Sequence, residues 1–146
     1  MKPRLVVAPC FLFAVALVVA RPTARAGEQV EPKTYQLSAS VVPAPLPVGS
    51  TGTYTLTVLP EPPWVMKAET PIDCVLKPAA GLAVEKARLS NKDLVDPKAT
   101  AKSVTTRVTG KAAGRHALEA EISFFLCTQD LCKRSRDVVR IEVEVK

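Results

Sequence analysis

The sequence is short of the residues on which most catalytic sites depend. Its 146 residues include one histidine, His116, and only six glycines. No serine stands in a recognisable motif with a histidine and a carboxylate, and no glycine-rich loop of the kind that cradles phosphate is present. Glu85, Asp93 and Asp96 lack the alternating spacing of a calcium-binding loop. These absences argue against a hydrolase, a kinase and a nucleotide-binding protein.

Net charge is also scarce once the first residues are set aside. The chain carries 20 Lys and Arg against 14 Asp and Glu, a formal charge of +6. Residues 1–26 hold four of the basic residues and no acidic one, which leaves 16 basic against 14 acidic residues in the remainder. The basic character therefore belongs mostly to the start of the chain, and it gives no support to binding of nucleic acid or of a membrane surface.

Residues 1–26 have the layout of a secretory signal peptide. A short basic start precedes an apolar run over 5–20, and Ala24 and Ala26 occupy the small-residue positions of a cleavage site. An uncleaved membrane anchor is the alternative, but the run is short for a span of about 20 residues. We predict cleavage after Ala26 and a periplasmic or otherwise exported domain over 27–146, with no membrane span after cleavage.

The pattern beyond the leader has a period of two, and no segment is typical of a long amphipathic helix. Apolar residues alternate with polar ones in runs that proline- and glycine-containing turns separate. The clearest runs are 35–41, 54–58, 72–76, 104–108, 118–126 and 139–145, and LAVEKARL (82–89) is a further candidate strand. The number and spacing of these runs predict an all-β fold, an immunoglobulin-like antiparallel β-sandwich of about seven strands. A small open barrel is the alternative.

The stretch FFLCTQDLCK, residues 124–133, brings Cys127 and Cys132 close together in the sequence. If the strands on either side form a hairpin, the two cysteines lie opposite each other. Directly opposed strand residues have Cα atoms about 4.5 to 5.5 Å apart, a separation that a disulfide can span. Because Leu126 faces the core, alternation turns both sulfur atoms away from it, and we expect an exposed pair.

This register makes further pairs that can be checked. It sets Phe125 against Arg134 and Glu119 against Arg140, the latter a favourable cross-strand charge pair. It also sets Ile122 against Asp137 on the inner face, which is a poor match. We expect a bulge or a late strand start near Asp137 to relieve it.

Three uses of the cysteine pair remain open at this point. An inert staple across so short a loop contributes roughly 2 kcal/mol. An exchangeable disulfide is favoured by the basic Lys133, Arg134 and Arg136, because positive charge lowers the pKa of a thiol. Half of a metal site is the third, but the spacing is not that of common zinc sites, and Cys74 and His116 are distant in sequence. We therefore expect no metal and no cofactor.

The chain from about Pro60 to Lys146 resembles the N-terminal periplasmic domain of the thiol:disulfide interchange protein DsbD, and the small exported proteins that carry this domain alone. The similarity runs through PPWVMKAETP and GLAVEKARL to the long strand that leads into C-x₄-C, and then to a final alternating strand. The resemblance implies an immunoglobulin-like sandwich. It also implies that Cys127 and Cys132 take the places of a catalytic redox pair. In the family a membrane-embedded partner domain reduces this pair, which passes electrons to periplasmic disulfide proteins.

From the residues and the resemblance together we expect an exported thiol–disulfide exchange module. Its partner would be another exported or membrane thiol–disulfide protein. The module would pass electrons to or from this partner, or form mixed disulfides with it, through its own Cys127 and Cys132. The alternative is a non-enzymatic immunoglobulin-like protein-binding domain, in which the hairpin disulfide is structural. Nucleic acid is not an expected partner.

Four further residues need a separate expectation. Cys74 shares an apolar face with Ile72 and Leu76 and is expected to be buried and unpaired. Trp64, in a proline-rich turn, is a candidate for covering the cysteine pair or contacting a partner, although a core-edge position is more typical. Phe125 is a second candidate partner contact, and His116 is expected to be a strand-end residue.

Overall fold

The structure, a computed structural model, describes residues 32–146, so the predicted signal peptide lies outside the described residues. The elements in chain order are β1 (Tyr35–Val42), β2 (Thr51–Pro60), β3 (Asp73–Pro78), β4 (Leu82–Val84), β5 (Arg88–Ser90), the 3₁₀ turn η1 (Asn91–Asp93), β6 (Lys102–Gly110), β7 (Gly114–Cys127) and β8 (Cys132–Val145). Within this part of the chain no helix is long and apolar enough to cross a membrane.

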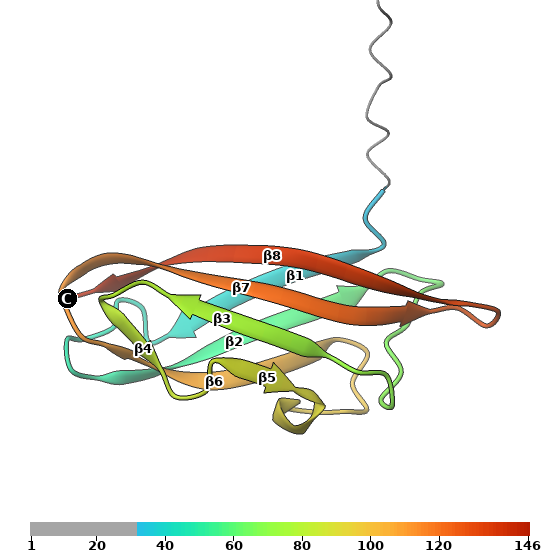
Figure 1. Ribbon diagram of the computed structural model, residues 1–146, viewed down its shortest axis with the longest axis horizontal. Coiled ribbons are helices and arrows are strands. Elements are labelled where there is room, and N and C mark those ends of the chain that lie inside the picture. The colour runs from blue at the N-terminus through green and yellow to red at the C-terminus, as the bar shows by residue number, and fades with distance from the viewer. Residues whose placement is uncertain (1–31) are drawn as a thin grey trace, which may run out of the picture. The chain divides into compact units, whose positions relative to one another are not determined.

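The strands form two four-stranded antiparallel sheets that pack face to face (Figure 1). The first sheet has the order β1-β2-β6-β4 and the second the order β5-β3-β7-β8. The prediction of an all-β, immunoglobulin-like sandwich is confirmed, and the alternative of an open barrel is wrong. The core lies between the sheets, and the face of each sheet that points away from the other is called its outer face below.

Alternation along each strand builds this core, because every second side chain points to the same face. Along β7 the residues from Leu118 to Leu126 alternate between buried and more exposed positions, and β2 and β6 show the same pattern. The buried side chains include Tyr54, Leu56, Val58, Ile72, Cys74, Leu76, Val104, Val108, Leu118, Ala120, Ile122, Phe124 and Leu126. These are the inward-facing residues that the period-two pattern predicts.

The segment LAVEKARL differs from the prediction. It forms two short strands instead of one: β4 pairs with β6 in the first sheet, and β5 pairs with β3 in the second. The chain crosses from one sheet to the other between Val84 and Arg88, where Glu85, Lys86 and Ala87 separate the two strands. The sandwich therefore has eight strands instead of seven, since three-residue strands are too short to show a period in the sequence.

The loop between β1 and β2 closes one end of the sandwich. The N–H of Leu46 donates to the carbonyl of Glu144 at 2.8 Å, and the N–H of Lys146 donates to the carbonyl of Leu46 at 3.0 Å. Leu46 is fully buried and joins the core. These bonds tie the end of β8 to the first sheet, so that the long β7–β8 hairpin is anchored at the end opposite its tip.

Candidate functional site

The β7–β8 hairpin carries the cysteine pair at its tip. Cys127 is the last residue of β7, Cys132 is the first of β8, and the two are joined by a disulfide with a Cα–Cα distance of 4.0 Å. The ladder pairs all fourteen residues of each strand in one register, with Phe125 opposite Arg134 and Glu119 opposite Arg140. The predicted register is confirmed.

The loop between the cysteines is closed by its own first residue, Thr128. Its N–H donates to the carbonyl of Leu131 at 2.8 Å, and its Oγ1 accepts from the N–H groups of Asp130 and Leu131 at 3.4 and 3.3 Å. Threonine hydroxyls commonly stabilise turns in this way. The hydrogen-bonded turn therefore closes the loop between the two cysteines in addition to the S–S bond.

The two sulfur-bearing residues differ in exposure, and the expectation that both are exposed is wrong for one of them. Cys132 is exposed, whereas Cys127 is completely buried, although it lies outside the core cluster. Val65 pairs with Cys127 in an isolated antiparallel bridge, with hydrogen bonds of 2.8 and 2.9 Å, and occupies the edge of β7 that is remote from β8. Cys127 thus lies between Val65 and Cys132 on the outer face of the second sheet.

This bridge also explains the closeness of the disulfide-bonded pair. The N–H and C=O of Cys127 are both bonded to Val65, so Cys127 and Cys132 face each other at a non-hydrogen-bonded position of the hairpin ladder. Such positions bring side chains closer together than hydrogen-bonded positions do. Sequence reasoning missed Val65, because the apolar run WVM is too short and follows too many prolines to predict a strand partner.

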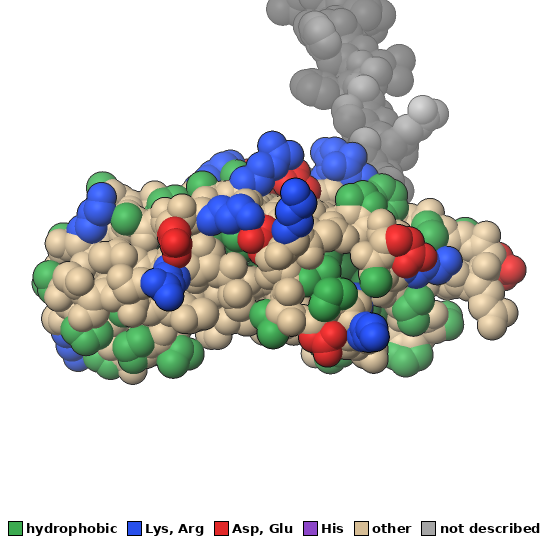
Figure 2. All heavy atoms as spheres, turned by 90° about the horizontal axis from the view of Figure 1, so that it is seen from below, with side chains coloured by type: hydrophobic (Ala, Val, Ile, Leu, Met, Phe, Trp, Pro, Cys, Tyr) green, Lys and Arg blue, Asp and Glu red, His purple; other side chains and the backbone are tan. Residues whose placement is uncertain are grey.

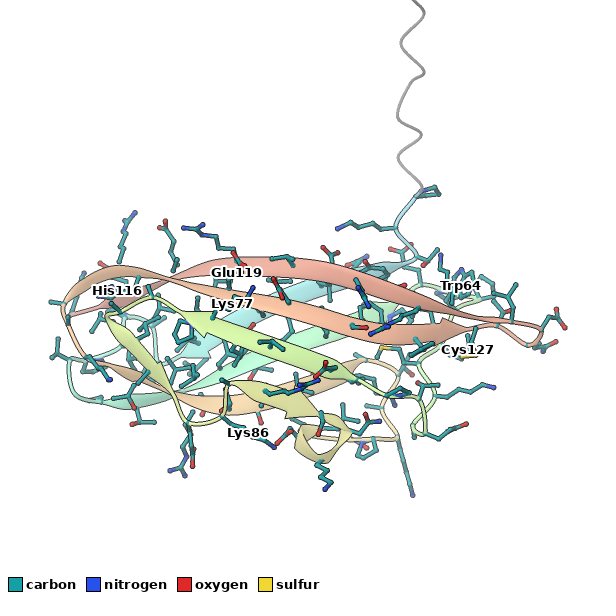
Figure 3. The ribbon with its side chains drawn as sticks, viewed as in Figure 1. Trp64, Lys77, Lys86, His116, Glu119 and Cys127 are labelled. Carbon is teal, nitrogen blue, oxygen red and sulfur yellow. A yellow bond between two sulfur atoms is a disulfide. The ribbon has the colours of Figure 1, made fainter. Side chains whose placement is uncertain are left out.

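Trp64 lies at the same end of the sandwich as the cysteines (Figure 3) but packs against the core. The Lys133 ammonium stands 4.5 Å from the centre of its ring, a geometry that stabilises the cation. Lys133 pairs with the buried Leu126, so it alternates to the face opposite Cys132. Trp64 therefore holds the core-edge position, and Lys133, contrary to expectation, is turned away from the sulfur atoms.

Phe125 and Arg134 share the outer face with the disulfide. Phe125 is half-buried, and the Nε of Arg134 donates to the hydroxyl of Ser123 at 2.8 Å. The exposed side chains of Val65 and Leu131 also lie near the hairpin tip. Arg134 thus shares a face with Cys132, but its side chain reaches along the sheet to Ser123, which lies opposite Arg136.

The expected bulge near Asp137 is absent, since β8 continues through this position without interruption. The mismatch with Ile122 is relieved by Tyr35 of β1 and by Lys33, which lies just before that strand. The Asp137 carboxylate accepts hydrogen bonds from Lys33 Nζ at 2.8 Å and from the Tyr35 hydroxyl at 3.0 Å. Burial alone would raise the pKa of Asp137, but Lys33, the Val138 N–H and Tyr35 outweigh it and hold that pKa below its usual value.

Cys74 is confirmed as a buried free thiol. It is fully buried on β3 opposite Leu89 and Ile122. Burial, together with the negative charge of Asp73, raises the pKa of the Cys74 thiol to about 12. The thiolate is the reactive form of cysteine, so Cys74 is inert in the folded domain and belongs to no site with the other two cysteines.

His116 lies at the end of the sandwich remote from the disulfide (Figure 3). Its Nε2 is 2.8 Å from the carbonyl oxygen of Ala112, and its ring packs over Gly81, where a Cβ atom would overlap it. The strand-end position predicted for it is confirmed. Over residues 32–146 no three His, Cys, Asp or Glu side chains gather in a way that could hold a metal ion.

No protein-family model and no curated protein sequence matches the chain. Among solved structures it is similar to a cohesin module from the family 33 glycoside hydrolase of Clostridium perfringens, with 10% identity over 77% of this chain and 96% of that one and a TM-score of 0.46. It is also similar to AggA, the major subunit of aggregative adherence fimbriae type I from Escherichia coli, with 12% identity over 78% and 97% of the two chains and a TM-score of 0.37. Likenesses as remote as these have no bearing on function.

Proposed function

We propose that the protein is an exported thiol–disulfide exchange module, which works through Cys127 and Cys132. The observation that carries the proposal is the asymmetry of the disulfide at the hairpin tip, with one exposed and one buried cysteine. The resemblance to the N-terminal domain of DsbD supports the same reading, and so does the predicted signal peptide, since disulfides persist in exported proteins.

The asymmetry assigns different roles to the two sulfur atoms. A partner thiolate attacks the exposed Sγ of Cys132, the S–S bond breaks, and Cys127 leaves with the bonding electron pair and takes up a proton. The partner is now joined to Cys132 in a mixed disulfide. A second thiol of the partner attacks the partner's own sulfur atom in that bond and releases Cys132. The partner ends as a disulfide, and this protein ends as a dithiol.

The reverse direction uses the same residues. The Cys132 thiolate attacks a partner disulfide, and one partner thiolate leaves. Cys127, held within bonding distance by the hairpin, then attacks Sγ of Cys132 and releases the second partner thiolate. The Thr128 hydrogen bonds involve neither sulfur atom, which favours a turn that keeps Cys127 opposite Cys132 in the dithiol.

A redox titration of the Cys127–Cys132 bond tests the proposal. The protein is equilibrated with dithiothreitol buffers of known potential, and the fraction of reduced pair is read by thiol labelling and mass mapping. A reduction potential above about −300 mV is expected for an exchangeable bond, and a lower one marks a structural disulfide and overturns the proposal. Cys74 serves as the internal control, because it stays unlabelled in the native protein at every potential.

A second candidate function rests on the burial of Cys127. In this alternative the disulfide only fixes the hairpin tip of an immunoglobulin-like protein-binding domain, and the buried sulfur is part of the structure. The double variant Cys127→Ser, Cys132→Ser then loses about 2 kcal/mol of unfolding free energy and still binds the protein partner of the native domain. The exchange proposal requires instead that capture of the partner depend on the two sulfur atoms, so that this variant no longer holds it.

A further inference from the structure

A groove of about 600 Å³ lies on the second sheet, between the outer-face side chains of β3, β7 and β8. Its lining includes Arg134 and Arg136 of β8, together with Ser123 of β7. Both arginines are exposed, and they stand two and four residues after Cys132 on the same face of β8. The groove crosses β3, β7 and β8, and its Arg134 lies two residues along β8 from Cys132, on the same face.

The charges of the groove are not balanced within it. Its lining includes three carboxylates, each of which is paired with a cation that is not part of the lining. Asp73 pairs with Arg88 at 2.8 Å, Asp137 pairs with Lys33 at 2.8 Å, and Glu121 pairs with Lys77. Cations outside the lining therefore neutralise all three carboxylates of the groove.

The two arginines are left without a carboxylate. Arg134 donates to the uncharged Ser123 hydroxyl, and within residues 32–146 neither Arg134 nor Arg136 lies within ion-pair distance of an Asp or Glu. Figure 2 shows basic side chains gathered along the long edge of the molecule where the second sheet is seen in profile, with carboxylates between them. A groove with two unpaired guanidinium groups is complementary to a ligand that carries carboxylates.

The spacing of the arginines matches an extended peptide. Successive residues on one face of a strand are about 6.8 Å apart. An extended segment whose cysteine reaches Cys132 presents side chains to the groove at the same interval. Carboxylates placed two and four residues from that cysteine fall opposite Arg134 and Arg136.

We propose that the groove docks an extended acidic segment of the partner thiol–disulfide protein, with carboxylates two and four residues from the partner's reactive cysteine. The role of that cysteine rests on the proposed exchange function, whereas the preference for carboxylates rests on the groove alone. The groove selects the partner by charge and holds its thiol beside Cys132.

The test uses two synthetic ten-residue peptides that differ only in charge. Each has one cysteine, with Glu at the second and fourth positions after it in one peptide and Lys in the other. The full chain with Cys10→Ser is the common background, so that Cys10, which lies outside the described residues, does not compete. The rate of mixed-disulfide formation at Cys132 is measured at low and high salt. Binding is measured separately by fluorescence anisotropy, with peptides in which serine replaces the cysteine.

The arginines are tested by a matched pair of double variants. Arg134→Gln with Arg136→Gln removes both guanidinium groups of the groove. Arg115→Gln with Arg140→Gln removes two from the same sheet outside it, so the net charge changes equally. We expect the starting protein and the control to react about five-fold faster with the Glu peptide than with the Lys peptide at low salt, and the groove variant to show almost no preference.

Each outcome separates the two proposals. The docking proposal is refuted if the starting protein shows no preference for the Glu peptide. It is also refuted if all three proteins prefer this peptide equally, or if both variants lose the preference equally. Exchange without a charge preference leaves the exchange function standing and refutes the docking proposal. A charge preference in binding without any exchange supports the groove and refutes the exchange function.

Discussion

The hydroxyl of Tyr35 on β1 donates a 3.0 Å hydrogen bond to the carboxylate of Asp137 on β8, and this bond joins the neighbouring edges of the two sheets. The Tyr35 ring also packs edge-on against Phe124 of β7, with ring centres 4.9 Å apart. Burial and the Asp137 carboxylate together raise the pKa of Tyr35 to about 12, so the phenol stays protonated and remains a donor. The contact lies midway along the hairpin that ends in the disulfide.

The two tyrosines of the chain make a matched comparison. Tyr35→Phe removes a hydrogen bond to a charged group, and we expect it to lower the unfolding free energy by about 1 kcal/mol. The hydroxyl of Tyr54 is fully buried and has no hydrogen-bond partner among the described residues. Tyr54→Phe is therefore expected to leave stability unchanged or to raise it, since a buried unsatisfied group is removed. Chemical denaturation of both variants measures the difference, and a larger loss for Tyr54→Phe contradicts the assignment.

Asp137 predicts a dependence of stability on acid. Its pKa is held below the usual value in the folded protein, so its contribution is fully present above the ordinary carboxyl pKa of about 3.9 and is lost as the pH falls through the lower, folded value. We expect the gap in unfolding free energy between the native protein and Asp137→Asn to be constant from about pH 5 to 7 and to narrow below about pH 4. A difference in unfolding free energy that does not change with pH shows that the charge of the Asp137 carboxylate contributes nothing to stability.

Much of the hairpin follows from the sequence because two simple rules act along it. Alternation fixes which side chains of β7 face inwards, and the two cysteines fix the register, so that Phe125 opposite Arg134 and Glu119 opposite Arg140 are both predicted correctly. A fourteen-residue strand shows its period clearly. The same rules identify Cys74 as a core residue from its neighbours Ile72 and Leu76.

Two failures at the hairpin share one cause, which is contact between segments that are distant in the chain. Alternation turns Cys127 away from the core, but it does not show that Val65 bonds to Cys127 on its other side and contributes to its burial. Likewise, Asp137 is a poor neighbour for Ile122 within the hairpin, and the donors that accommodate it, Lys33 and Tyr35, come from the start of the domain, about 100 residues earlier in the chain. Local pattern does not encode these tertiary contacts.

Gly81 tests the packing at the end remote from the disulfide. A Cβ at this position would overlap the His116 ring, so Gly81→Ala must displace the ring and break its contact with the Ala112 carbonyl. We expect a loss of roughly 1–3 kcal/mol in unfolding free energy, as in other overpacked sites. In the background His116→Ser the same substitution should cost much less, because the ring is gone. A double-mutant cycle measures this coupling, and equal costs in both backgrounds contradict it.

The three cysteines of the described domain should differ in reactivity in a fixed order. After reduction and removal of the reductant, we expect iodoacetamide at pH 8 to modify Cys132 first, because it is exposed, and Cys127 more slowly, because it is buried. Cys74 is fully buried and burial raises the pKa of its thiol to about 12, so it should react only after unfolding. Mass mapping of the alkylated peptides against time gives the three rates.

Val65→Pro is the matched test of the difference between Cys132 and Cys127. Proline has no N–H to donate to the Cys127 carbonyl, so this variant should bring the rate of Cys127 closer to that of Cys132. A native protein in which Cys127 reacts faster than Cys132 would reverse the roles assigned to the two sulfur atoms, whatever the reduction potential of the bond.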